Sequence, residues 1–78
     1  MIVTLIGKPG CHLCDDARAV IQDVLKEFGD IAFVERSILD DPELRDAYAE
    51  EIPVVLIDGA QHTYWRVDPG RLRAALRA

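Results

Sequence analysis

The chain has 78 residues, of which 50% are hydrophobic and 29% are charged, a composition typical of soluble globular domains rather than of disordered or membrane proteins. Nine lysine and arginine residues against fourteen aspartate and glutamate residues give a net charge of −5, the wrong sign for a nucleic-acid-binding surface. We therefore expect one domain over residues 1–78, a monomer that binds neither nucleic acid nor a membrane.

The chain opens with hydrophobic, mostly β-branched residues from Ile2 to Ile6, which are typical of a strand covered on both faces in a parallel sheet. This start lacks the basic segment and cleavage site of a signal peptide, so we expect a cytoplasmic protein. Residues 7–10 interrupt the pattern. Hydrophobic residues then recur at helical spacing from Leu13 to Phe28, and Gly29 is the expected left-handed cap of this helix.

Two cysteines in C-x-x-C spacing, Cys11 and Cys14, lie where this helix begins. Residues i and i+3 share one helical turn, so their sulfurs can approach closely enough for a reversible disulfide. The unpaired N–H groups and the helix dipole favour a thiolate at Cys11, the outermost sulfur. Cys14 shares the hydrophobic face and should be shielded. We interpret the pair as redox-active rather than as half of a zinc site, since zinc usually needs four ligands.

The middle of the chain predicts a second strand and a short helix. Residues 31–36 form the strand, which completes a right-handed βαβ unit with the cysteines at the carboxyl end of its first strand. Asp41-Pro42 then combines an N-cap residue with a proline at the first helical position. The helical pattern that follows stops near Ile52.

The last third of the chain predicts a hairpin and a final helix. Residues 53–57 and 60–66 flank Asp58-Gly59, a strong signal for a two-residue turn between antiparallel strands. Asp68-Pro69 again places an N-cap residue before a proline at the start of a helix. The complete order of elements is βαβαββα.

This order, with a C-x-x-C after the first strand and Ile52-Pro53 at the head of the third, resembles the glutaredoxin branch of the thioredoxin superfamily over the whole chain. Residues 9–15 and 52–55 are similar to those of small bacterial glutaredoxin-like proteins with a Cys-His-Leu-Cys motif. The resemblance implies an α/β fold with a mixed four-stranded sheet in the order 2-1-3-4 and helices on both faces.

The resemblance also implies roles for individual residues. Cys11 matches the attacking thiol, Cys14 the resolving thiol, and Pro53 the proline that follows a cis peptide bond beside the disulfide. That bond would turn the backbone of Ile52 towards a substrate, which could pair with it as an added strand. Lys8 matches a lysine that many glutaredoxins place near the thiolate and near a glutathione carboxylate.

His12 and Asp68 complete the candidate site residues. A protonated His12 would stabilise the Cys11 thiolate, although a merely exposed histidine is the simpler alternative. Asp68 is the one residue that could replace the Gly-Gly-x-Asp stretch with which glutaredoxins bind glutathione. Pro69 removes a backbone donor there, and Glu51 adds negative charge beside the pairing segment. These departures predict weak glutathione binding, and no cofactor is expected to be built into the chain.

The function favoured by the sequence is cytoplasmic dithiol–disulfide exchange with protein or small-molecule disulfides. Either glutathione or thioredoxin reductase would reduce the cysteine pair again. Two alternatives stay open at this point. Cys11 could ligate an iron–sulfur cluster shared between two chains, as some glutaredoxins do with help from glutathione, or the fold could serve only to bind a partner.

Overall fold

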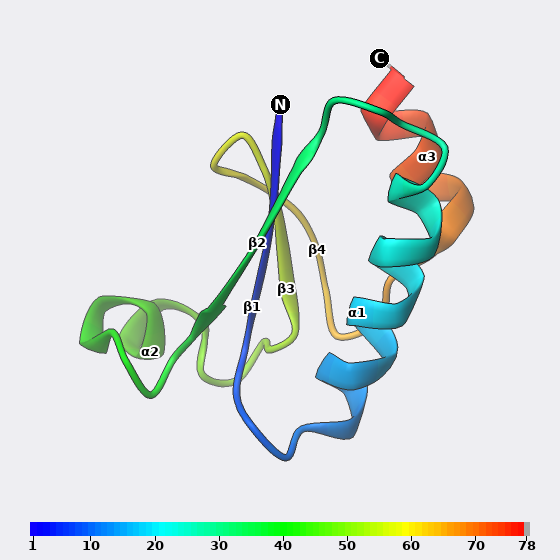
Figure 1. Cartoon of the computed structure of the whole chain (residues 1–78). Coiled ribbons are helices and arrows are strands. Elements are labelled where there is room, and N and C mark those ends of the chain that lie inside the picture. The colour runs from blue at the N-terminus through cyan, green and yellow to red at the C-terminus, as the bar shows by residue number, and fades with distance from the viewer. Residues whose placement is uncertain (78) are drawn as a thin grey trace.

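The computed structural model describes residues 1–77 as one mixed sheet of four strands with three helices (Figure 1). The strand order is β2-β1-β3-β4, with β1 and β2 parallel and the other pairs antiparallel, as the family resemblance implies. No helix in this part of the chain is long and apolar enough to cross a membrane. The elements are β1 (Ile2–Gly7), α1 (His12–Leu25), β2 (Ala32–Ser37), α2 (Pro42–Tyr48), β3 (Val54–Ile57), β4 (Ala60–Tyr64) and α3 (Pro69–Arg77).

The sheet separates two hydrophobic clusters, because successive side chains of a strand point to opposite faces. Val3, Leu5 and Val55 pack beneath α1 and α3, which lie together on one side of the sheet (Figure 1). Ile6 and Val54 pack on the other side, where α2 lies. β1 is therefore buried on both faces over most of its length, as its nearly continuous hydrophobic sequence predicts.

The end of α1 differs from the prediction. The helix ends at Leu25, and Gly29 does not adopt the expected left-handed conformation. The N–H groups of Glu27 and Phe28 instead donate to carbonyls three residues earlier, which tightens the last turn. Phe28 still packs on the core. The hydrophobic spacing from which the helix was predicted therefore extends three residues beyond the end of α1.

The start of α2 follows the prediction closely. The Asp41 carboxylate accepts a hydrogen bond from the Glu43 N–H at 2.9 Å, and Pro42 occupies the first turn. The carboxylate satisfies an N–H group that has no intrahelical partner at the start of the helix, and proline has no N–H group to satisfy. The helix ends at Tyr48, earlier than the expected limit near Ile52.

The hairpin has the predicted two-residue turn but a shorter second strand. Asp58 and Gly59 have φ values of 49° and 86°, as a type I′ turn requires at both central positions. β4 ends at Tyr64 rather than at residue 66. Its register shifts within the strand, since Thr63 pairs with Val55 while Gln61 pairs with Leu56. The residue between them, at position 62, is thus the extra residue of a β-bulge.

This bulge residue, His62, should make the fold sensitive to acid. Its Nε2 atom is buried without a partner among the described residues, and burial, followed by the charge of Arg71, lowers the pKa of the imidazole below its ordinary value of 6.5. Between the two pKa values, His62 therefore binds a proton in the unfolded chain but not in the folded chain. Stability should fall as the pH drops below about 6.5 and level off only below the pKa of the folded state.

Replacing His62 with leucine should remove part of this acid sensitivity. Urea unfolding midpoints of the wild type and of His62→Leu, measured from about pH 7.5 to about pH 5, would show a shallower decline in the variant. Parallel declines in the two proteins would contradict the assignment.

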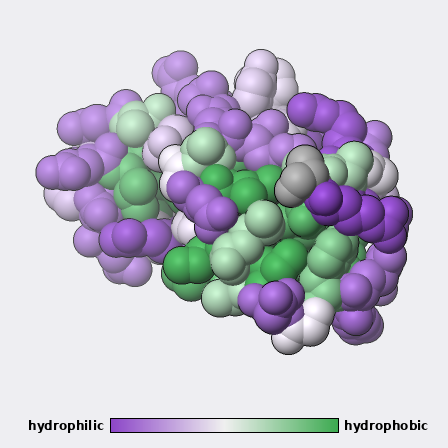
Figure 2. Space-filling model, turned by 90° about the horizontal axis from the view of Figure 1, so that it is seen from above, coloured by the Kyte–Doolittle hydropathy of each residue, from purple (hydrophilic) through white to green (hydrophobic). Residues whose placement is uncertain are grey.

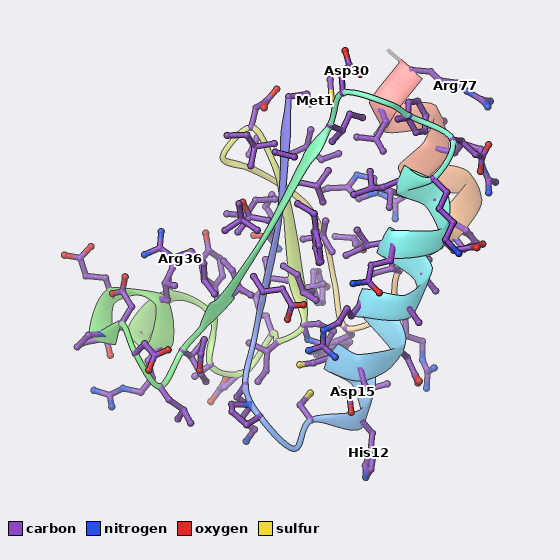
Figure 3. The ribbon with its side chains drawn as sticks, viewed as in Figure 1. Met1, His12, Asp15, Asp30, Arg36 and Arg77 are labelled. Carbon is purple, nitrogen blue, oxygen red and sulfur yellow. The ribbon has the colours of Figure 1, made fainter. Side chains whose placement is uncertain are left out.

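The end of the sheet that carries the N-terminus exposes hydrophobic side chains (Figure 2). Met1 and Ile2 are 48% and 47% exposed. Figure 3 places Met1 at the opposite end of the sheet from His12, which begins α1. This hydrophobic surface is therefore remote from the cysteines.

Candidate active site

The two cysteines lie at the carboxyl end of β1, where α1 begins (lower end of Figure 1). The first residue of β3, Val54, pairs with Ile6 near the end of β1. The segment before β3 therefore reaches the same end of the sheet as the cysteines. The fold brings Pro53 to this place across an antiparallel pair of strands, although it is far from the cysteines in sequence.

Cys11 occupies the N-cap position of α1, where a serine or an aspartate is more usual. Its Sγ atom accepts a hydrogen bond from the Cys14 N–H at 3.2 Å. This bond and the positive end of the helix dipole both favour negative charge on the sulfur. Cys11 is partly exposed, whereas Cys14 is 1% exposed, which confirms the expected difference in their accessibility.

The buried sulfur is held in its neutral form. Burial is the largest cause that raises the pKa of Cys14, to about 11, and the hydrogen bond and the charge of Cys11 add to it. Asp15 raises the pKa further, while a backbone hydrogen bond at Lys8 lowers it. Cys14 is therefore a thiol at neutral pH and a poor nucleophile while Cys11 is free.

Gly7 belongs to the site although the sequence analysis treated it only as a break after the first strand. A Cβ atom at Gly7 would lie 2.7 Å from Cys14 Sγ and 3.2 Å from Cys14 Cβ. Only glycine lets the start of α1 approach β1 this closely. The signal was the alternation of β1, which places Gly7 on the same face as Leu5, the face that α1 covers.

The segment before β3 has the backbone geometry that the resemblance implies. The Ile52-Pro53 peptide bond is cis, and Pro53 is fully buried. Ile52 is half-buried, and its N–H and C=O groups make no hydrogen bond within the part of the chain that the structure describes. The N–H group can donate a hydrogen bond to a bound molecule, and the C=O group can accept one from it.

Lys8 and His12 are exposed, and neither has an ion-pair partner in residues 1–77. His12 projects away from the sheet at the first turn of α1 (Figure 3). Lys8 lines a cavity of about 390 Å³, and Arg18 and Arg36 also line it. The electrostatic roles of Lys8 and His12 towards Cys11 remain predictions.

Asp68 is committed to the start of α3. Its Oδ1 atom accepts a hydrogen bond from the Arg71 N–H at 3.0 Å, and its C=O accepts one from Leu72. Figure 1 shows α3 beginning nearer the middle of the sheet than the cysteine end. A structural role as a helix cap thus accounts for Asp68, and its role in binding glutathione remains a prediction.

Among residues 1–77, no group of three or more histidine, cysteine, aspartate or glutamate side chains could hold a metal ion. A cluster shared between two chains would instead use Cys11 of each chain with thiols from elsewhere. That alternative also remains a prediction.

The family described as "Glutaredoxin-like domain (DUF836)" matches residues 2–77. The chain belongs to this family. A curated relative of the glutaredoxin-like chain, the uncharacterized protein Rv0508 of Mycobacterium tuberculosis, is 34% identical in an alignment of 76 positions that covers 92% of this chain and 78% of the relative. The X-ray structure of target protein XcR50 from X. campestris is 35% identical, with a TM-score of 0.78, and the match covers 96% of this chain and 95% of that one.

More distant solved structures share the fold. Protein Ne2328 from Nitrosomonas europaea is 20% identical, with a TM-score of 0.74 and coverage of 94% of this chain and 87% of that one. Thioredoxin 1 from Thermosipho africanus is 16% identical, with a TM-score of 0.65 and coverage of 99% and 96%. The glutaredoxin-like chain therefore has the thioredoxin fold, and its family supports a redox-type function in general.

Proposed function

We propose that this protein is a cytoplasmic dithiol–disulfide oxidoreductase that acts on protein or small-molecule disulfides. The observation that carries the proposal is the contrast between its two sulfurs. Cys11 caps α1 and is partly exposed, whereas Cys14 is buried and its pKa is raised to about 11. An accessible attacking sulfur beside a shielded, protonated one is the arrangement that a two-step exchange needs.

The first step is attack by the Cys11 thiolate on one sulfur of the substrate disulfide. The Cys11–substrate bond forms, the substrate S–S bond breaks, and the other substrate sulfur leaves as a thiolate that takes a proton from water. In the second step Cys14 gives its proton to water, and its thiolate attacks Cys11 Sγ. The Cys11–Cys14 disulfide forms and the second substrate thiolate leaves. Two electrons have passed from the cysteine pair to the substrate.

The order of the steps follows from the causes that raise the pKa of the Cys14 thiol. Two of the causes that raise the pKa of Cys14 are the hydrogen bond and the negative charge of Cys11. Both disappear once Cys11 is part of a mixed disulfide, because that sulfur is then neutral. Burial, the largest cause, remains, but the pKa of Cys14 should fall at this stage, so that Cys14 is a better nucleophile when a mixed disulfide is present to resolve.

For the return of electrons to the pair, we propose a protein reductase such as thioredoxin reductase, or another thiol donor, in preference to glutathione. The Asp68 carboxylate already caps α3, and Pro69 removes a backbone donor at the start of this helix. Glu51 adds negative charge beside Ile52. These features weaken two of the attractions that an anionic tripeptide would need.

One assay tests the function and the donor separately. The protein, reduced beforehand with dithiothreitol and freed of it, should reduce a model disulfide stoichiometrically. Turnover should then be fast with thioredoxin reductase and NADPH, and slower by about tenfold or more with glutathione and its reductase, given two weakened contacts of about 1 kcal/mol each. Failure of the first reaction would refute the oxidoreductase. Fast turnover with glutathione would refute only the choice of donor.

A further inference from the structure

Trp65, the only tryptophan of the chain, follows the last residue of β4 in an unusual backbone conformation. Its φ angle is 65°, in the left-handed region that bulky residues seldom adopt. Such a conformation persists only where surrounding contacts fix it, and residues of this kind gather at functional sites. Trp65 is also 52% exposed, so burial of its ring is not what holds it there.

The contacts that fix Trp65 are two hydrogen bonds to one neighbouring segment. Its backbone N–H donates to the Pro53 C=O at 2.7 Å, and its indole Nε1–H donates to the Glu50 C=O at 3.1 Å. Trp65, directly after β4, therefore donates a hydrogen bond to each end of the segment 50–53. The ring itself packs edge-on against Tyr64, with the ring centroids 4.9 Å apart.

The segment 50–53 lies at the same end of the sheet as the cysteines, and it contains backbone groups without partners among the described residues. Between the two hydrogen-bonded residues lies Ile52, whose N–H and C=O make no hydrogen bond within residues 1–77. The strand that follows is paired with the end of β1, where a Cβ atom at Gly7 would lie 2.7 Å from the Cys14 sulfur. An extended polypeptide can pair with such a segment only if the segment is held still, whereas a small disulfide without a peptide backbone gains nothing from it.

We propose that Trp65 is a positioning residue for polypeptide substrates. Its two N–H groups hold the backbone of Ile52 where a substrate strand can pair with it while the substrate disulfide meets Cys11. This inference rests on the proposed oxidoreductase function and adds the class of substrate that the site favours: an extended polypeptide disulfide rather than a small one.

The variant Trp65→Phe tests the inference because it keeps an aromatic ring and the backbone N–H but loses the Nε1–H donor to Glu50. For a disulfide-bonded peptide, KM should rise about 3- to 10-fold with kcat nearly unchanged, the effect of one lost hydrogen bond that contributes to binding. For dithiobisnitrobenzoate, which has no peptide backbone, kcat/KM should stay within about twofold of the wild type. Tyr64→Phe, which leaves both hydrogen bonds of Trp65 in place, is the matched control and should keep the wild-type KM.

The outcomes separate this inference from the proposed function. An unchanged peptide KM in Trp65→Phe would overturn it, and so would equal losses on both substrates, which would indicate general damage to the fold. A wild-type protein that reduces neither substrate would refute the oxidoreductase itself. If Trp65→Phe does not fold, the indole fluorescence of Cys14→Ser decides: it should shift on formation of the mixed disulfide with the peptide but not with mercaptoethanol, which has neither a peptide backbone nor a chromophore. An identical response to both would overturn the inference.

Discussion

Cys11→Ser is expected to reduce disulfide exchange to the background rate, whereas Cys14→Ser should still attack and then stop at the mixed disulfide. Cys11 is the partly exposed sulfur at the positive end of α1, so its loss removes the attacking group. Cys14 is 1% exposed, so its loss removes only the resolving step. The two substitutions are nearly isosteric and should differ in chemistry rather than in fold.

The contrast is measured by adding excess peptide disulfide to each reduced variant and recording intact masses. Cys14→Ser should gain the mass of one peptide half almost completely, and Cys11→Ser should remain unmodified. A double variant that lacks both thiols sets the background. Equal modification of the two single variants would contradict the assigned roles, because it would mean that both sulfurs are equally reachable.

The architecture was readable from the sequence wherever the signal was local. The continuous hydrophobic run of β1 predicts a strand covered on both faces, and Asp58-Gly59 predicts the two-residue turn that the backbone angles confirm. The cap of α2 by Asp41 is of the same kind. In each case the residues that determine the structure are adjacent in the chain, so no knowledge of distant contacts is needed.

The ends of helices and strands were predicted less well, because the backbone can end an element in several conformations of similar free energy. Gly29 suits a left-handed cap, yet α1 ends at Leu25 in a tighter turn that satisfies the same carbonyls. β4 ends at Tyr64 because a bulge and the left-handed Trp65 redirect the chain. These endings depend on contacts with the core and with the segment 50–53, which strand alternation cannot reveal.

The candidate site likewise has one part that local sequence determines and one part that depends on contacts between distant segments. Cys11 and Cys14 were recognisable because a single helical turn brings them together. Gly7 and Trp65 were missed as site residues, since their importance arises from approaches between separate elements: β1 against α1, and the end of β4 against the segment before β3. Residues that support a reactive pair are therefore harder to find from sequence than the pair itself.

Gly7→Ala is expected to slow the resolving step and to lower stability, because the new methyl group would lie 2.7 Å from Cys14 Sγ. β1 cannot easily retreat. Gly7 is paired with Ser37 in β2, and its C=O accepts a hydrogen bond from the Ile38 N–H at 2.9 Å. Either the start of α1 moves away, or Cys14 turns to another rotamer. Both changes alter the approach of Cys14 Sγ to Cys11, on which closure of the disulfide depends.

We expect a loss of about 1–3 kcal/mol in the free energy of unfolding, the usual cost of one methyl group too many in a packed region. Exchange should be slower, and the mixed disulfide on Cys11 should live longer than in the wild type. Urea unfolding gives the first quantity, and quenched samples analysed by mass give the second. Gly29→Ala is the matched control, because nothing lies within 4 Å of its new Cβ and its backbone is not left-handed.

The control should keep the wild-type exchange rate, with stability unchanged or raised by at most about 1 kcal/mol through the loss of backbone freedom in the unfolded chain. If Gly7→Ala matched Gly29→Ala in both stability and lifetime of the mixed disulfide, the close contact between β1 and Cys14 would have no part in the chemistry. A Gly7→Ala protein that is destabilised but resolves at the wild-type rate would limit the contact to packing. Slower resolution in a folded Gly7→Ala protein would instead show that the closeness of β1 to α1 sets the geometry of the cysteine pair.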